Sequence, residues 1–437
     1  MTPTKLPLLS TVTALDTPLV WREGAPISRA AFLRQVAGIA RHLPAVRFIF
    51  NRCEDRYRFM ALFAAVGVNG QTNLLPSSRA DLHLQQLAEA YPDSASVVDA
   101  DLAAWLALET ADDLPPTVPE LPVAQIMAIA FTSGSTGRAK PHPKTWGELM
   151  NGAQQARHRF GFAAGTGIVA TVPPQHLYGL ETSIMAPLTG GVSVHAGRPF
   201  FPEDVRTALL ETPGRRVLVT TPVHLRACVS AGLRWPDMAW LISATAPLAP
   251  ELAAQAEAAF NAPVLEIYGC TEAGSIASRR TLDGDRWRLY DGFHWHDGEL
   301  SGAHLPEPVA LSDIVEVCSE TEFTLIGRSE DLVNIAGKRS SLAYLNHQIN
   351  AIAGVTEGVF AMPDGTGGGV ERLIALVVAP GLSEREILTA LAERLDPLFL
   401  PRPLLKVEAL PRNETGKITR ERLLALVAVL RSTVDEV

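Results

Sequence analysis

Short apolar segments alternate with helix-like segments from about residue 121 onward. The apolar segments are rich in branched aliphatic residues, which is typical of strands buried on both faces of a sheet. They lie between residues 123 and 269 and read VAQIMAIAF, GIVATVP, GVSVHAG, RVLVTTP, MAWLISATA and PVLEIYG. This pattern predicts a series of buried strands.

The segments between these strands carry helical spacing of apolar residues or signals for a helix start. Pro250 stands just before Glu251, where the first turn of a helix tolerates proline. Alternating strands and helices predict an α/β fold with mostly parallel sheets covered on both faces. The predicted helices read WGELMNGAQQARHRF, LETSIMAPL, PEDVRTALLE, HLRACVSAG and PELAAQAEAAF.

The pattern changes after Gly274, where RWRLYDGFHWHDGEL and IVEVCSETEFTLIG are typical of antiparallel strands joined by turns. From Leu342 onward, a smaller set of helices and strands follows. We therefore expect a large N-terminal domain at residues 1–328 that ends in a β-rich subdomain. We expect a small, mobile α+β C-terminal domain at residues 331–437, with a hinge near residues 329–331.

Composition narrows the class of protein. The 437 residues are 47% hydrophobic and 19% charged, which is ordinary for a soluble protein of two or three domains. The net charge of −9 argues against a broad nucleic-acid surface. The four cysteines form no CxxC pair, and no run approaches the roughly 18 apolar residues that span a membrane. We expect a soluble, cytoplasmic protein that contacts neither nucleic acid nor membrane.

The segment FTSGSTGRAK, residues 131–140, raises a question of chemistry. Taken alone, it fits a flexible Ser/Gly linker. Its position between a predicted strand and a predicted helix favours phosphate binding, because backbone N–H groups freed by Gly134 and Gly137 can surround an anion. Lys140 adds positive charge. The segment is not a Walker A loop, because GxxxxGK[ST] does not fit GSTGRAK.

FTSGSTGRAK resembles the phosphate loop of the adenylate-forming (ANL) superfamily, which includes acyl- and aryl-CoA ligases, peptide-synthetase adenylation domains and luciferases. Six further segments resemble the motifs of this family in the same order. They read PPQHLYGLE, LISATAPLAP, EIYGCTEAG, ALSDIV, GRSEDLVNIAGKR and LPRNETGKITRERL. The resemblance thus covers residues 131 to 423, which is most of the chain, and rests on a series of motifs.

The resemblance implies that the chain binds ATP and Mg²⁺. Tyr268 would stack on adenine, Thr271 would contact the α-phosphate and Glu272 would hold Mg²⁺, which prefers oxygen ligands. Asp313 would accept both ribose hydroxyls. The residues that the resemblance implies for ATP or AMP binding are Thr132, Ser133, Gly134, Ser135, Thr136, Gly137, Ala244, Glu266, Tyr268, Asp313 and Arg328.

The resemblance also implies a pocket for a carboxylic acid. Where the family has a glycine early in the LISATAPLAP turn, this chain has Ser243, Ala244 and Thr245, which would narrow the pocket or offer a hydroxyl to a polar substrate. The residues implied for this pocket are His176, Tyr178, Ile242, Ser243, Gly269 and Cys270.

Lys417 matches the family lysine that bridges the acid carboxylate and the α-phosphate. With Lys140, Thr271 and Glu272 it completes the implied catalytic set. In the second half-reaction, the small domain would turn about Glu330. The loop with Gly337 would then border the tunnel for an acceptor thiol, which belongs to CoA or to phosphopantetheine.

The chain departs from the family pattern in three further places. LSD replaces TGD before Ile314, RAKPHP replaces the usual PKG ending of the phosphate loop, and the region before that loop is short. The retention of Lys140, Glu272, Arg328 and Lys417 nevertheless favours an active enzyme.

The implied activity is ATP-dependent formation of an acyl-AMP, followed by transfer of the acyl group to a pantetheine thiol. A compact, partly polar pocket favours an aryl acid such as a hydroxybenzoate. The short length and the loop ending resemble ligases of xanthomonadin and aryl-polyene pigment clusters, which load an acyl carrier protein. Basic residues that could dock an acidic carrier are Arg402, Lys406, Arg412, Arg420 and Arg422.

Three other interpretations stay open on the sequence. One is a synthetase for medium- or short-chain fatty acyl-CoA, and another is a catalytically silent nucleotide-binding scaffold of the same fold. A third is a luciferase-like oxygenase, which no feature of the sequence supports.

Overall fold

The computed structural model describes residues 4–76, 81–108, 117–133, 139–302, 304–305, 307–311, 313–328, 332–335, 338–362, 372–412 and 418–434. The chain divides into two compact units, Met1–Val309 and Ala310–Val437. The expected hinge at residues 329–331 lies outside the described residues, so that domain boundary stays a prediction. No helix in the described ranges is long and apolar enough to cross a membrane.

The main sheet of the first unit contains five of the six predicted buried strands in a continuous series, whereas the first of them, VAQIMAIAF, lies in the second sheet as β8 (Ile126–Ser133). The order of the main sheet is β16-β15-β14-β13-β12-β10-β11-β2-β3. The strands from β14 to β2 in this order are parallel, and β15, β16 and β3 are antiparallel to their neighbours. Their bounds are β2 Pro18–Arg22, β3 Ala25–Ser28, β10 Thr166–Ala170, β11 Ser193–His195, β12 Arg215–Thr220, β13 Trp240–Ser243, β14 Val264–Cys270, β15 Gly274–Arg280 and β16 Arg286–Leu289.

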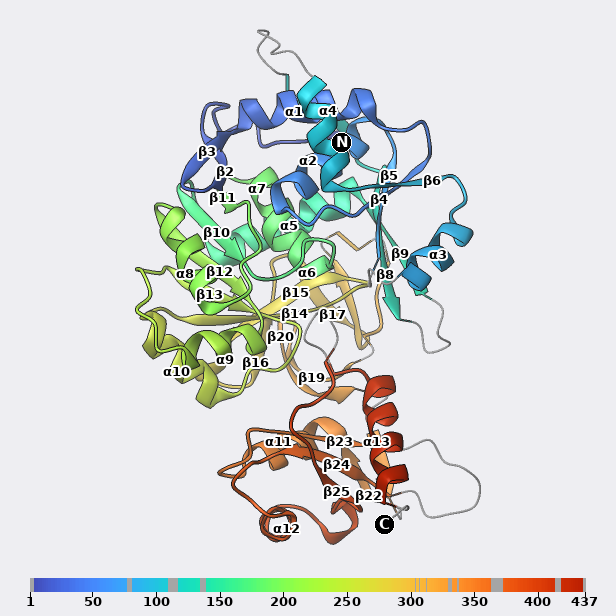
Figure 1. The fold of residues 1–437 in the computed structure, drawn as a ribbon, viewed down its shortest axis with the longest axis vertical. Helices are drawn as coiled ribbons and strands as arrows, with labels where there is room; N and C mark the ends of the chain where they lie inside the picture. Colours follow the sequence, from blue (N-terminus) through green and yellow to red (C-terminus); the bar gives the residue numbers. More distant parts are fainter. Residues whose placement is uncertain are drawn as a thin grey trace. The chain divides into compact units, whose positions relative to one another are not determined.

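Helices cover the parallel strands, as the alternating pattern predicts (Figure 1). One apolar cluster joins alternate positions of four adjacent strands to the helices α8, α9 and α10. These helices span Pro202–Glu211, Pro222–Ser230 and Pro250–Phe260. The strand residues of the cluster are Val169, Leu218, Leu241 and Val264. Because side chains alternate across a strand, the same face continues two residues later with Thr171, Thr220, Ser243 and Glu266.

The segment predicted as one helix at LETSIMAPL is helical but interrupted. It consists of α6 (Leu177–Leu180), a π-helical segment η1 (Glu181–Met185) and α7 (Ala186–Thr189). A π-helical turn inside a helix is uncommon and shifts the face on which the following side chains lie. The preceding helix α5 (Trp146–Phe160) has the predicted bounds and begins with a capping box between Thr145 and Glu148.

A second sheet contains the strands on both sides of residues 134–138, which belong to the predicted phosphate loop and lie outside the described residues. Its order is β6-β4-β5-β8-β9, and only β9 is antiparallel to its neighbour. Its strands are β4 Phe48–Asn51, β5 Thr72–Leu75, β6 Ser94–Val97, β8 Ile126–Ser133 and β9 Ala139–Thr145. The helices of this region are α1 Arg29–His42, α2 Arg56–Val68, α3 Asp81–Ala90 and α4 Asp99–Leu108. Two small antiparallel pairs complete the unit, β1 (Lys5–Pro7) with β7 (Glu120–Pro122) and β17 (Phe293–His296) with β18 (Glu299–Gly302).

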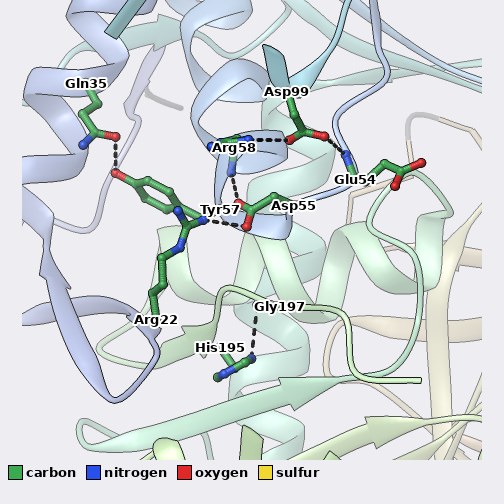
Figure 2. A network of polar contacts seen from close by, with 9 residues as sticks. All are labelled: Arg22, Gln35, Glu54, Asp55, Tyr57, Arg58, Asp99, His195 and Gly197. Atoms are coloured by element: carbon green, nitrogen blue, oxygen red, sulfur yellow. Dashed lines mark hydrogen bonds and ion pairs between the residues drawn. The ribbon is translucent and has the colours of Figure 1, made fainter. Parts of the chain in front are cut away.

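A polar network joins the two sheets at the start of α2 (Figure 2). Asp55 caps this helix by accepting from the backbone N–H of Arg58, and its carboxylate also pairs with Arg22 of β2 at 2.6 Å. Asp99 accepts from the backbone N–H of Glu54 at 2.7 Å. The residue after Asp55 in the chain, the fully buried Arg56, donates to the carbonyl oxygens of Ala170, at the end of β10, and Val172. These contacts lock the second sheet against the main sheet.

The second unit combines hairpins with a small helix-covered sheet. The hairpins are β19 (Asp313–Ser319) with β20 (Glu322–Arg328) and β21 (Leu332–Ile335) with β22 (Lys338–Ser341). The small sheet has the order β23-β24-β25, with bounds Glu357–Ala361, Ile374–Val378 and Leu404–Lys406. The helices α11 (Leu342–Asn350), α12 (Glu384–Ala392) and α13 (Arg420–Val434) all lie in the part of the chain from Leu342 onward, where the sequence predicts a smaller set of helices and strands. The predicted α/β class with a smaller α+β part is thus confirmed.

A bidentate ion pair fastens α10 to the end of β15. Glu257 accepts from Arg280 at 2.6 and 2.9 Å and from the backbone N–H of Val264 at 2.9 Å. These hydrogen bonds from Arg280 hold the pKa of the Glu257 carboxyl below its ordinary value. A depressed carboxyl pKa stabilises the fold above the unfolded-state pKa, and this contribution is lost as the pH falls through the folded-state value.

We therefore expect Glu257→Gln to lower the free energy of unfolding by about 1 kcal/mol at neutral pH. The difference from wild type should shrink as the pH falls below about 4. Urea unfolding at several pH values measures both effects. In Arg280→Gln, the further change Glu257→Gln should cost less than it does in wild type, and a full additive cost would contradict the pairing.

Candidate functional site

The predicted phosphate loop connects two antiparallel strands. β8 pairs with β9 from Ile126↔Thr145 to Ser133↔Ala139, and helix α5 begins only after β9. The sequence pattern predicts strand, loop and helix, so β9 is an element that this prediction lacks. The sequence pattern did not predict β9 because this segment contains prolines, and proline is rare in strands except at sheet edges. β9 is an edge strand, and its Pro141 and Pro143 are exposed.

The alternation along β9 buries two basic side chains. His142 and Lys144 are each 7% exposed, while Pro141 and Pro143 face solvent. Burial lowers the pKa of His142, and the carboxylate of Glu272 raises it again in part. Lys140, implied to be catalytic, is exposed. The inward face of β9 therefore lies near Glu272, which belongs to another of the predicted motifs.

The turn between β14 and β15 carries the residues implied for adenine, α-phosphate and Mg²⁺. Tyr268 lies at a bulge in the β14–β15 pairing, and its ring packs 5.6 Å from that of Trp287. Thr271 is half-buried and Glu272 is exposed. Lys144 Nζ donates to the carbonyl oxygen of Glu272 at 2.7 Å. The fold thus joins the strand after the phosphate loop directly to this turn.

The side chains of Glu181 and His304 hold the same turn, and the resemblance implies a role for neither, although Glu181 is the last residue of PPQHLYGLE. Glu181, in η1, accepts from the backbone N–H of Ser275 at 3.2 Å and also from its hydroxyl. His304 Nε2 contacts the carbonyl oxygen of Ala273 at 3.0 Å. In the sequence, the alternation of proline with a basic residue in PHPK is a signal that could have pointed to Lys144.

The Glu272 carboxylate fits the single protein ligand that Mg²⁺ often uses beside substrate phosphates. Its side chain is exposed, and it takes part in none of the ion pairs that the structure shows within its described ranges. No group of three or more His, Cys, Asp or Glu side chains that could hold a metal ion occurs among the described residues. The described residues therefore contain no metal site built from several protein ligands.

Glu266, implied to meet the adenine amino group, lies in a buried network. Its carboxylate accepts from the backbone N–H of Leu248 at 3.0 Å, from Arg279 at 2.7 Å and from the hydroxyl of Thr281 at 2.7 Å. These contacts tie the turn after β13 to β15. Glu266 therefore positions the loop that contains Ala244, and its contact with adenine stays a prediction.

Two of the residues implied for the acid pocket lie together at the ends of β12 and β13. Tyr178 donates from its hydroxyl toward the carbonyl oxygens of Thr220 and Ile242, each at 3.1 Å, so its hydroxyl already has acceptors within the protein. Burial raises the pKa of this phenol, which therefore stays neutral.

Ser243 and Cys270 contribute uncharged groups. Ser243 is fully buried, and its hydroxyl has no hydrogen-bond partner in the described structure. Thr245, two residues on, has φ +79, which is strained for a β-branched residue. Burial raises the pKa of the Cys270 thiol to about 11, so this cysteine is not a thiolate at neutral pH. His176 lies at the N-cap of α6 and is half-buried.

Asp313, implied for ribose, and Arg328, implied for ATP or AMP binding, lie opposite each other in the second unit. Asp313 and Arg328 are register partners in the β19–β20 hairpin, although their motifs are separate in the sequence. The other implied residues lie outside the described residues, namely Gly134, Ser135, Thr136, Gly137, Glu330, Gly337 and Lys417. Thr132 and Ser133 lie in β8.

Comparison with known families and proteins gives three kinds of match. The family model described as AMP-binding enzyme matches residues 40–294. A 4-coumarate–CoA ligase of Rhodobacter capsulatus is 28% identical over 298 residues, which are 66% of this chain and 74% of that protein. A 2-succinylbenzoate–CoA ligase of Staphylococcus epidermidis is 26% identical over 336 residues, which are 68% of this chain and 69% of that protein.

Solved structures match the fold over nearly the whole chain. The O-succinylbenzoate coenzyme A synthetase from Bacillus subtilis, in complex with AMP, has a TM-score of 0.82 at 16% identity. The match covers 96% of this chain and 98% of that one. ATP-bound MatB from Rhodopseudomonas palustris has a TM-score of 0.80 at 19% identity, covering 96% of each chain.

Proposed function

The chain belongs to the family of AMP-binding enzymes, and on that premise we propose that it is an ATP-dependent acid–thiol ligase. It first joins a carboxylic acid to AMP and then transfers the acyl group to a pantetheine thiol. The observation that carries the proposal is the contact between Lys144, on the strand after the phosphate loop, and the turn that bears Thr271 and Glu272. The strand that follows one motif implied to hold ATP phosphates therefore contacts the turn of another.

In the first step, a carboxylate oxygen attacks the α-phosphorus of ATP, the bond to the β-phosphate oxygen breaks, and pyrophosphate leaves. No proton transfer is needed, so positioning and neutralisation of charge supply most of the catalysis. The hydroxyls of Thr132 and Ser133, with Lys140 and Lys417, bind and orient the phosphates and the carboxylate. Bound Mg²⁺ would neutralise further phosphate charge beside Glu272.

In the second step, the acceptor thiol attacks the acyl carbon, the thiol proton passes to solvent, and AMP leaves. Lys140 is exposed, so its charge is accessible to the phosphates of ATP. The uncharged thiol of Cys270 does not compete as a nucleophile, because burial raises its pKa to about 11.

An aryl acid is the substrate class that we propose. The matched relatives are ligases named for 4-coumarate and 2-succinylbenzoate, which are both aryl acids. The fully buried hydroxyl of Ser243 adds a polar group to an otherwise uncharged wall. A hydroxybenzoate combines a compact ring with a group that can form hydrogen bonds. We therefore propose it as the acid, as in ligases that load acyl carrier proteins in pigment clusters.

The acceptor is proposed to be an acyl carrier protein or CoA. Of the basic residues considered for docking, Lys406 donates to the carbonyl oxygen of Leu382 and Arg422 to that of Arg412. Lys406, Arg402 and Arg422 are exposed, so their charge faces solvent and could meet an acidic partner.

Pyrophosphate exchange with a panel of acids tests the function. We expect exchange with hydroxybenzoates and cinnamates and little with medium-chain fatty acids, because a compact polar pocket excludes long chains. If ATP binds but no acid supports exchange, the chain is a nucleotide-binding scaffold and the ligase proposal fails. Offering CoA and a holo carrier protein in parallel then identifies the acceptor.

A further inference from the structure

We propose that Lys144 and Glu181 are positioning residues that hold the turn at residues 270–275 from two sides, and so fix the place of the Glu272 carboxylate. The proposal rests on the proposed function, because Glu272 matters only if the chain binds ATP with a divalent cation. Lys144 lies outside the motifs by which the family resemblance is recognised, and Glu181 is the last residue of PPQHLYGLE but has no role implied by that resemblance.

The first support is the burial of Lys144. A lysine side chain is almost never buried without a partner, since removing its charge from water is costly. Lys144 is nevertheless 7% exposed, and its ammonium donates to the carbonyl oxygen of Glu272 at 2.7 Å. The two residues are 128 positions apart in the chain. The contact therefore crosses from the edge strand of one sheet to a turn of the other.

Glu181 provides the second support, on the far side of the turn. Its carboxylate accepts both the backbone N–H and the hydroxyl of Ser275, and it is buried. The positive charge of Lys144 favours the ionised form of Glu181, against the burial that raises its pKa. The two side chains thus compensate each other's charge while each holds a different part of the turn.

The turn is shaped to admit the Glu181 carboxylate. Gly274 has φ +76, a region that favours glycine. A Cβ at this position would lie 2.6 Å from Glu181 Oε1. The absence of a side chain at residue 274 is therefore what lets the carboxylate reach the backbone N–H of Ser275.

The consequence is a rigid backbone beneath an exposed carboxylate. Lys144 holds the carbonyl oxygen of Glu272, and Glu181 holds the N–H of Ser275 three residues later. The Glu272 side chain itself stays exposed. Groups that orient a metal ligand in this way typically change metal affinity or activity by about 10- to 100-fold when they are removed. We expect Lys144 and Glu181 to act on Mg²⁺-dependent binding of ATP in that range.

The test compares binding of a non-hydrolysable ATP analogue with and without Mg²⁺, measured by calorimetry on the full chain. In Lys144→Met, the gain in affinity that Mg²⁺ gives should fall at least about 10-fold, while binding without Mg²⁺ stays near wild type. Lys144→Arg should recover most of the gain, because a guanidinium can donate to the same carbonyl oxygen. Glu181→Gln should show a smaller loss of the same sign, because its amide nitrogen cannot accept the Ser275 hydroxyl.

Arg159→Met is the matched control. Arg159 lies on α5 and donates to the hydroxyl of Ser278 at 2.6 Å, on the same strand as Ser275. Its loss removes a half-buried cation of the same region without touching the turn. We expect lower thermal stability and an unchanged effect of Mg²⁺ on analogue binding.

Two outcomes overturn the proposal. One is a wild-type effect of Mg²⁺ in Lys144→Met, and the other is an equal loss in Arg159→Met, which would show general loosening. Thermal melts verify that the variants fold. If Lys144→Met does not fold, the effect of Mg²⁺ on analogue binding in Lys144→Arg and Glu181→Gln still tests the proposal. Failure of the wild-type chain in pyrophosphate exchange, by contrast, refutes the proposed function itself.

Discussion

Replacing Lys417 with alanine is expected to lower the rate of adenylation by about 10²- to 10³-fold. The physical reason is electrostatic, since a carboxylate must approach an α-phosphate and both are negatively charged. A lysine that bridges them offsets this repulsion as the new bond forms. Pyrophosphate exchange measures the loss directly. Thioester formation from supplied acyl-AMP should be largely retained, because the lysine is not required once AMP is the leaving group.

Lys406→Ala is a suitable control for this prediction. Lys406 lies in the same C-terminal unit and donates to the carbonyl oxygen of Leu382. Its substitution therefore removes a lysine from this unit and leaves the motif LPRNETGKITRERL intact. We expect near-normal rates of adenylation and, with CoA as the acceptor, of thioester formation. Equal loss of both half-reactions in Lys417→Ala would contradict the role of Lys417. That role rests on the resemblance of LPRNETGKITRERL to the family motif, because Lys417 lies outside the described residues.

Gly269→Ala is expected to lower adenylation by about 10²-fold, the scale on which displacements near 1 Å act at reacting groups. A Cβ at residue 269 would lie 2.8 Å from Ser275 Cα and closer still to the carbonyl oxygen of Gly274. Both neighbours are backbone atoms of the paired strand β15, so neither can rotate away. The clash of the added Cβ with this backbone can therefore be removed only if the turn that carries Thr271 and Glu272 shifts. The free energy of unfolding should also fall by about 1–3 kcal/mol.

The control for this substitution is Gly381→Ala. Gly381 is exposed, and a Cβ there would meet no atom within 4 Å. Exchange rate and melting temperature should both match wild type. Wild-type exchange in Gly269→Ala would show that the turn tolerates displacement, and the steric argument would then be wrong.

The buried strands and their helices could be read from the sequence because they depend on local patterns. α5, α8 and α10 begin and end where capping signals and apolar spacing predict. β10, β12, β13 and β14 follow the apolar segments, although their ends differ by a few residues. A buried strand needs apolar residues on both faces, and a helix needs them on one, so composition along the chain encodes both.

β9 was not predicted because its sequence resembles a loop. AKPHPKT contains two prolines in seven residues, and each removes a backbone donor. The loss of these donors is tolerated only because β9 lies at the edge of the second sheet, where every other backbone N–H has no neighbouring strand to pair with. Edge position is a property of the assembled sheet and has no local signal.

By itself, the sequence determined the order of the motifs, the chemical type of each group and the α/β class. Tertiary structure alone decided which groups meet. Glu272 is hydrogen-bonded to Lys144, which lies 128 positions away in the chain, and Ser275 is hydrogen-bonded to Glu181, which lies 94 positions away. The physical reason is that spacing along a chain fixes geometry only within an element. Contacts between sheets depend on how whole elements pack. That packing places Lys144 and Glu181, to which the sequence assigned no role, against the turn of the candidate site.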